Sequence, residues 1–231
     1  ANPYSRALRL GRALVGLGYD VEVAATHEAG APLEQPDGDL VIRRYPPSGP
    51  FRSLAATYSA ARPVPRRLPR PLRVLRTMRN RFLMWWFWPV LVRGWWHTLA
   101  RELPPADLYH ACGTLPIAAA LAARERDRKA GRRSVVIFDV IDITMESNNV
   151  LRIPKSVLWW LARRERRWAR AADGLTAVND AFADWAQEHW DLRVRPTVVP
   201  NYPEPQPEPT GPGPDLVRQA TGLPASTRIL L

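Results

Sequence analysis

The chain has 231 residues, 46% of them hydrophobic, which is enough to bury a core in one large domain or two small ones. A single cysteine, Cys112, excludes an internal disulfide and predicts a reducing, cytoplasmic setting. The formal net charge of +11 is uneven, because residues 62–101 hold ten arginines and no Asp or Glu. The four histidines are scattered, and we expect no structural metal.

The first third of the chain predicts one helix and two strands. Ser5 is a suitable N-cap for a helix over residues 6–17, whose leucines repeat at helical spacing. Residues 21–26 and 40–46 are predicted strands, and residues 28–39 between them are predicted to form a loop. The helix has no strand in front of it, although a doubly wound domain needs one, so we expect a fragment that lacks this first strand.

The arginine-rich segment predicts helices interrupted by prolines. Residues 51–61 are expected to form a short helix, and the proline-rich residues 62–71 do not continue it. Residues 72–88 and 90–101 are predicted helices that Pro89 separates.

The second half alternates short apolar strands with helices. The predicted strands are 107–111, 135–138, 174–178 and 196–200, and the predicted helices are 115–130, 154–173 and 181–190. This alternation predicts an α/β fold, a Rossmann-like doubly wound parallel sheet covered on both faces. In such sheets ligands bind beyond the carboxyl ends of the strands. Asp139, Asp142, Asn179 and Asn201 all follow predicted strands and are expected at that edge.

Four segments of this half carry a resemblance to a known family. In order and spacing they resemble the amino-terminal domain of family 4 glycosyltransferases, which have the GT-B fold. The segments are DLYHACG (107–113), FDVID (138–142), ERRWARAADGLTAVNDAFADW (165–185) and PTVVPN (196–201). The resemblance covers roughly residues 3–201, and TGLPASTRILL (221–231) resembles the first strand of the carboxy-terminal domain.

The resemblance implies a division of the chain into three parts. Residues 1–201 would form the acceptor-binding domain, residues 202–214 a proline-rich linker, and residues 215–231 the truncated start of the donor-binding domain. The activity implied is a retaining transfer of a glycosyl group, of hexosyltransferase type, from a nucleotide-diphosphate sugar to an acceptor hydroxyl. No cofactor is implied. The groups that stabilise the leaving diphosphate belong to the donor-binding domain, so the isolated fragment is expected to be inactive.

Two carboxylates are the candidate catalytic residues. Asp139 and Asp142 would orient an acceptor hydroxyl or help to deprotonate it. Alternatively, they cap the next turn or pair with an arginine such as Arg152. The sequence departs from the family pattern here, because Ile141 occupies a position where many members have a histidine. A role of that histidine therefore cannot be transferred to this chain.

Five further polar residues are candidate contacts of the acceptor. Arg6, at the start of the first helix, and His110, at the end of a strand, match polar positions of the family. Their alternatives are a solvated surface arginine and a buried, hydrogen-bonded histidine. Glu146 lies in a polar loop that would bind a polyhydroxylated acceptor or form an ordinary turn. Asn179 and Asn201 complete the set.

Residues 66–88 combine an apolar helical face with arginines and tryptophans. This pattern predicts a helix lying at an anionic membrane surface, on the inner face of the cell membrane. The apolar run of residues 82–92 is too short to span a bilayer. The alternative is a core helix, which we expect instead for Trp95 and Leu99. The predicted membrane-surface residues are Arg73, Arg76, Arg81, Trp85 and Trp86.

Other functions remain open at this level. The charge would also suit nucleic acid, but no zinc knuckle, RNP-type strand or helix-turn-helix spacing accompanies it. A membrane-surface binding module without catalysis and a GT-B-like sugar-nucleotide epimerase are the alternatives to a glycosyltransferase. A lipid-linked or cell-envelope acceptor is the class that the basic aromatic segment suggests. The oligomeric state is not predicted.

Overall fold

The fold is given by a computed structural model that describes residues 5–27, 30–46, 69–86, 93–143, 155–202, 216–222 and 224. The chain divides into two units, Ala1–Asn201 and Tyr202–Leu231. The predicted helix over 51–61, the Pro89 break, Glu146 and most of the strand expected within residues 221–231 lie outside the described residues.

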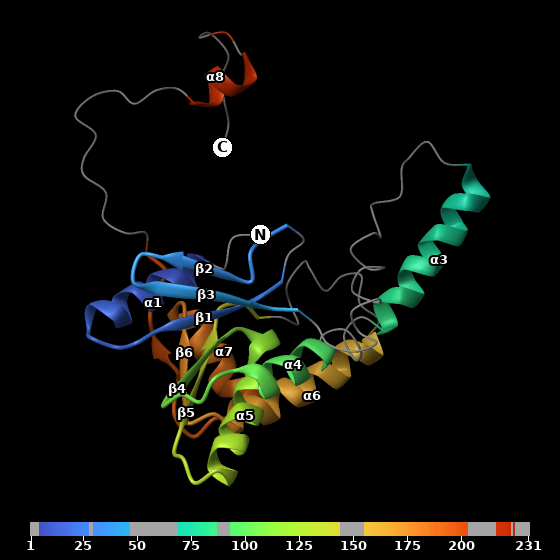
Figure 1. The fold of residues 1–231 in the computed structure, drawn as a ribbon. Coiled ribbons are helices and arrows are strands. Elements are labelled where there is room, and N and C mark those ends of the chain that lie inside the picture. The colour runs from blue at the N-terminus through green and yellow to red at the C-terminus, as the bar shows by residue number, and fades with distance from the viewer. Residues whose placement is uncertain are drawn as a thin grey trace. The chain divides into compact units, whose positions relative to one another are not determined.

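A four-stranded parallel sheet organises the larger unit (Figure 1). Its strands pair in chain order with all neighbours parallel, as the alternation of strands and helices predicts. The strands are β4 (Leu108–Cys112), β5 (Val135–Val140), β6 (Gly174–Ala177) and β7 (Thr197–Val198).

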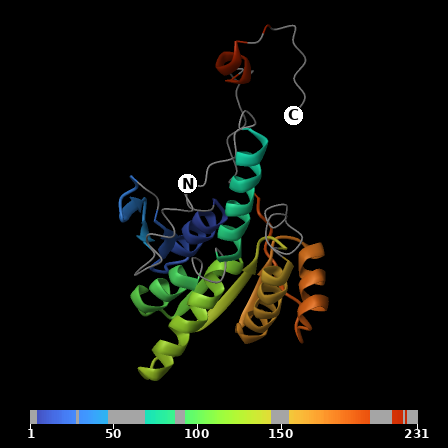
Figure 2. The same cartoon turned by 90° about the vertical axis from the view of Figure 1, so that its right-hand side faces the viewer.

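One face of this sheet carries the main core. Val136, Phe138 and Val140 alternate along β5 and are at most 1% exposed. They pack with the buried faces of three helices, α5 (Thr114–Lys129), α6 (Lys155–Ala171) and α7 (Asp180–Trp190). Figure 2 shows these helices side by side on one face. Right-handed crossovers in a sheet that grows in one direction place successive helices on the same face.

A second cluster of buried residues extends this core sideways. Helix α4 (Arg93–Glu102) packs against α5, and Leu99 and Trp96 are 2% and 6% exposed. The rings of Trp96 and Trp168 meet edge to face at 4.9 Å. Leu99 and the partly buried Trp95 thus lie in the core, as the sequence predicts.

A smaller sheet lies in the amino-terminal part. Strand β1 (Glu22–Thr26) pairs in parallel with β3 (Leu40–Tyr45), and β2 (Glu34–Asp37) pairs antiparallel with β3 at the edge. The prediction of a loop throughout 28–39 is wrong for β2. Gly38, at φ 62°, and Asp39 form a two-residue hairpin turn, and an edge strand tolerates the proline at position 36.

Three further helices complete the description. Helix α1 (Ser5–Gly16) packs against β1 and β3, where Gly11 lets Leu40 approach closely. Helix α3 (Arg70–Trp86) leaves several apolar side chains exposed. In the second unit, α8 (Leu216–Thr221) is held by a hydrogen bond from Arg218 Nε to the carbonyl of Pro224 at 3.1 Å. Among the described residues, no helix has both the length and the apolar character needed to cross a membrane.

Candidate functional site

A row of polar side chains crosses the parallel sheet close to the carboxyl ends of its strands. Cys112, Asp139 and Thr176 are neighbours in register on β4, β5 and β6. Asp139 alternates with the core residues Phe138 and Val140, so its side chain leaves β5 on the face opposite to α5, α6 and α7. Helix α1 lies on this face and provides the side chain that binds Asp139, so the sheet has helices on both sides.

Arg6 of α1 reaches the centre of this row. Its Nε and Nη2 atoms donate to Asp139 Oδ2 at 2.7 Å and to Oδ1 at 2.9 Å. Thr176 Oγ1 donates to Asp139 Oδ1 at 2.7 Å. Arg6 is 2% exposed and Asp139 is fully buried, so the fork-shaped guanidinium and the carboxylate satisfy each other away from water. The pair anchors the first turn of α1 to β5.

His110 and Cys112 flank this ion pair. Burial lowers the pKa of His110, and the nearby positive charge of Arg6 acts in the same direction against the opposing effect of Asp139. Its buried Nε2 has no hydrogen-bond partner among the described residues. Burial, and then the charge of Asp139, raises the pKa of Cys112 to about 12. At neutral pH the imidazole of His110 is therefore uncharged and the thiol of Cys112 is protonated.

These residues also form the one group of possible metal ligands within the described part of the chain. Ligand atoms of His110, Cys112 and Asp139 lie within 4.8 Å of one another. Both carboxylate oxygens of Asp139, however, already accept from Arg6, whose permanent positive charge would repel a cation. The raised pKa of Cys112 also disfavours the thiolate that a metal would bind. The chemistry of the set favours the Arg6–Asp139 ion pair over a metal site.

Helix α1 is tied to the end of the sheet at a second point. Arg9, one turn after Arg6, donates from Nη2 to the side-chain oxygen of Asn201. Asn201 follows β7. Helix α1 therefore contacts two residues that are distant in the sequence: Asp139 lies 133 positions after Arg6, and Asn201 lies 192 positions after Arg9. Asn179 has a local role instead, because its exposed side chain accepts from the backbone N–H of Phe182 and caps α7.

The structure thus separates the predicted site residues. It brings Arg6, His110 and Asp139 together, and it joins Asn201 to the same helix. Asp142 lies just beyond β5 and is exposed. Ile141 packs over Gly113, whose left-handed φ of 86° and lack of a side chain leave room for it.

Two residues of this network were missed from the sequence. Thr176 lies within a short strand, and its partner on β5 depends on a register that the sequence does not reveal. Arg9 has a usable signal, because it follows Arg6 by three positions and residues with this spacing share one face of a helix.

The fold and this polar edge define a Rossmann-like α/β domain of the kind found in GT-B glycosyltransferases. The sequence model of Glycosyltransferase Family 4 matches residues 5–202, which is most of the chain. The chain therefore belongs to glycosyltransferase family 4, and the matched region corresponds to the amino-terminal domain of a GT-B enzyme. No curated protein matches the chain.

Proposed function

We propose that the chain forms the acceptor-binding side of a retaining glycosyltransferase that uses a nucleotide-diphosphate sugar. One observation carries the proposal: the buried Arg6–Asp139 pair fixes the start of α1 at the carboxyl edge, next to His110 and the exposed Asp142. The family membership supports transfer of a glycosyl group in general. A transfer of hexosyltransferase type to an acceptor hydroxyl is part of the proposal.

The two predicted catalytic carboxylates are assigned different roles. Asp139 has no exposed surface and both its oxygens are engaged, so it acts as a positioning residue that holds Arg6. Asp142 is exposed to solvent and is free to accept a hydrogen bond from an acceptor hydroxyl. Burial suits the first residue for rigidity, and exposure suits the second for contact with a substrate.

We further propose that these 231 residues alone do not transfer sugar. Transfer requires cationic groups or helix N-termini that stabilise the leaving diphosphate. At the carboxyl edge of the parallel sheet, the guanidinium of Arg6 already donates to Asp139 and is therefore not available to a diphosphate. The donor would therefore be bound by groups outside this network.

Saturation-transfer NMR with the whole chain tests the acceptor assignment. We expect signals from glycosides or lipid-linked acceptor analogues and none from nucleotide-diphosphate sugars. Asp142→Asn should weaken acceptor binding about fivefold, because a neutral amide oxygen accepts a weaker hydrogen bond than a carboxylate oxygen does. Asp20→Asn is the matched control. Asp20 is exposed like Asp142, but it lies before the amino end of β1, whereas Asp142 lies beyond the carboxyl end of β5. Nucleotide-sugar binding that survives without any acceptor binding would contradict the proposal, as would transfer of labelled sugar by the chain alone.

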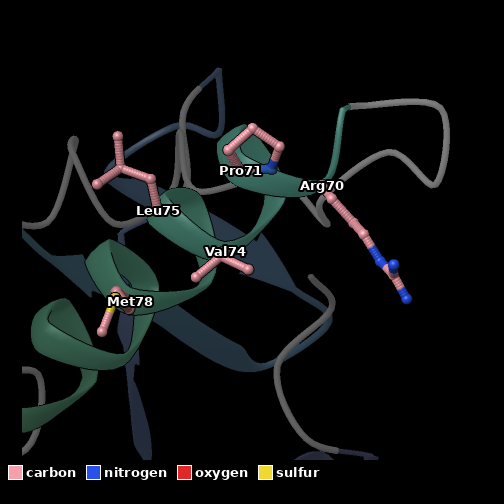
Figure 3. A pocket seen from close by; sticks show the side chains of 5 residues that line it. All are labelled: Arg70, Pro71, Val74, Leu75 and Met78. Atoms are coloured by element: carbon pink, nitrogen blue, oxygen red, sulfur yellow. The ribbon is translucent and has the colours of Figure 1, made fainter.

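A second candidate function is attachment to an anionic membrane surface through α3, on the inner face of the cell membrane. Leu75 and Met78 are 66% and 65% exposed, and with Val74 they line a shallow apolar surface (Figure 3). Arg70 lines this surface, and Arg79 is exposed on the same helix. The side chains of Arg73, Arg81, Trp85 and Trp86 lie outside the part that the structure describes. An apolar face beside cationic side chains suits the headgroup region of a bilayer. A lipid-linked or cell-envelope acceptor would fit this placement.

Vesicle co-sedimentation tests this attachment. The triple variant Arg73→Glu, Arg76→Glu and Arg81→Glu should bind vesicles containing phosphatidylglycerol at least a hundredfold more weakly than the parent chain, since each cation near an anionic surface contributes about 1 kcal/mol. Unchanged binding would remove α3 from the membrane contact.

A further inference from the structure

A second basic surface lies on the outer face of α6, on the side away from the core. Residues on this side repeat every three or four positions and so form one stripe along the helix. The single acid of α6, Glu165, is 1% exposed and contributes nothing to the stripe. The exposed residues of the stripe are Lys155, Trp159, Arg163, Arg166, Arg167 and Arg170.

The charge of the stripe is only weakly neutralised. Arg166 and Arg170 share one exposed carboxylate, that of Asp191, at 3.4 and 3.6 Å. Within the described ranges, no carboxylate lies in ion-pair distance of Arg163 or Arg167. The stripe therefore retains a positive field that attracts an anionic partner.

An exposed tryptophan stands within this stripe. Trp159 is 62% exposed, and the guanidinium of Arg163 lies 4.7 Å from the centre of its ring. Stacking on a ring engages the flat face of a guanidinium and leaves the N–H groups at its edge available for phosphate oxygens. Trp159 and Arg163 thus form one patch with an apolar and a cationic part.

We propose that the outer face of α6 docks onto the phosphate layer of an anionic membrane leaflet. The cations match lipid phosphates, and an indole beside them suits the headgroup region. The face is preformed, because Leu161 and Val157 on the other side of α6 are held in the core. A single exposed tryptophan does not provide the successive stacking platforms typical of single-stranded nucleic-acid binding.

The stripe also has a direction relative to the candidate site. Helix α6 follows β5 and precedes β6 in a parallel crossover, so its amino end, with Lys155 and Trp159, lies toward the carboxyl ends of the strands. Docking through this end would bring the edge with Asp142 close to the headgroups. This consequence rests on the proposed acceptor function, whereas docking itself does not.

The test uses the whole chain and two pairs of charge reversals. Arg163→Glu with Arg167→Glu alters the stripe. Arg133→Glu with Arg193→Glu makes the same change in net charge at exposed positions in other connections of the sheet. Binding is measured on vesicles of phosphatidylcholine with phosphatidylglycerol, and on phosphatidylcholine alone, at low and high salt. We expect the stripe variant to bind the anionic vesicles about 30-fold more weakly and the control pair to bind like the parent.

Three results would overturn the proposal. The first is unchanged vesicle binding by the stripe variant, and the second is an equal loss of vesicle binding in the control pair. The third is binding of the parent chain to a single-stranded oligonucleotide in place of vesicles, weakened by the same stripe substitutions. A Trp159→Phe variant adds a local readout. Brominated lipids should quench a smaller fraction of the tryptophan fluorescence in this variant than in the parent chain. The α3 triple variant, measured in parallel, shows separately whether that helix contributes. Loss in the α3 variant alone would support the attachment through α3 and refute docking through α6.

Discussion

Helices α3 and α6 have the same length, 17 residues, and both combine arginines and tryptophans with an apolar face. Their apolar faces are used differently. In α6, Leu161 is fully buried and Val157 is 7% exposed. In α3, Leu75 and Met78 remain about two-thirds exposed, at 66% and 65%.

The difference shows that an amphipathic pattern does not by itself choose between core and interface. Helix α6 lies between α5 and α7 and against the sheet, so its apolar face has protein neighbours. The apolar face of α3 has no such cover among the described residues. The outer side of α6 then carries the cations, whereas in α3 cations and the exposed apolar face occur together on one helix.

Hydrogen exchange should give the largest contrast between the two helices. Amides in the middle of α6 open only with the surrounding core, whereas a 17-residue helix whose described apolar face stays exposed is marginal in water. We expect exchange in α6 to be on the order of a thousandfold slower than in α3. Anionic vesicles should slow exchange in α3. Equal protection of both helices in the absence of vesicles would show that α3 packs on the protein.

Leucine truncation should separate the helices energetically. Leu161→Ala removes a fully buried side chain and should lower the free energy of unfolding by about 2–5 kcal/mol. Leu75→Ala, on α3, is the matched control and should change it by less than about 0.5 kcal/mol. Urea unfolding followed by circular dichroism measures both. A similar cost for the two variants would contradict the contrast.

A buried polar contact of α6 provides a third comparison. Thr114 Oγ1 donates to the carboxylate of Glu165, which is 1% exposed. Thr114→Val keeps the shape but removes this donor, so we expect a loss of about 1.5–3 kcal/mol in the free energy of unfolding. The same exchange at the exposed Thr26 of β1 should cost less than about 0.5 kcal/mol. Equal losses would show that the buried contact stabilises the fold no more than an exposed hydroxyl.

The smallest expected effect concerns Trp159. Its ring is largely exposed and interacts with Arg163, so Trp159→Ala should cost about 0.5–1 kcal/mol of stability. Trp160, which packs against the buried cluster around Leu161, should cost clearly more when it is replaced by alanine. Thermal unfolding of the two variants makes the comparison. A larger loss for Trp159 than for Trp160 would place the outer face of α6 in a contact that the structure does not contain.

Much of the fold was predictable from local pattern. The strands, most helices and the parallel order of the second half follow from alternation of apolar runs with helical periodicity. The family was predictable from four segments and is confirmed over residues 5–202. Strand β2 was not predicted, because its pairing partner decides whether a proline-containing segment becomes an edge strand.

The candidate site shows the same division. The sequence by itself determined that Asp142 and Asn201 follow strands, because strand ends are local features, and it determined that a helix with arginines lies early in the chain. The prediction that Asp139 also follows a strand is wrong, because β5 continues to Val140 and Asp139 pairs within it. Only the tertiary structure decided that Arg6 buries its charge against Asp139, 133 residues away, while Asp142 stays exposed. The reason is physical: side-chain periodicity is set by the backbone of one element, but burial and charge pairing depend on which elements meet in space.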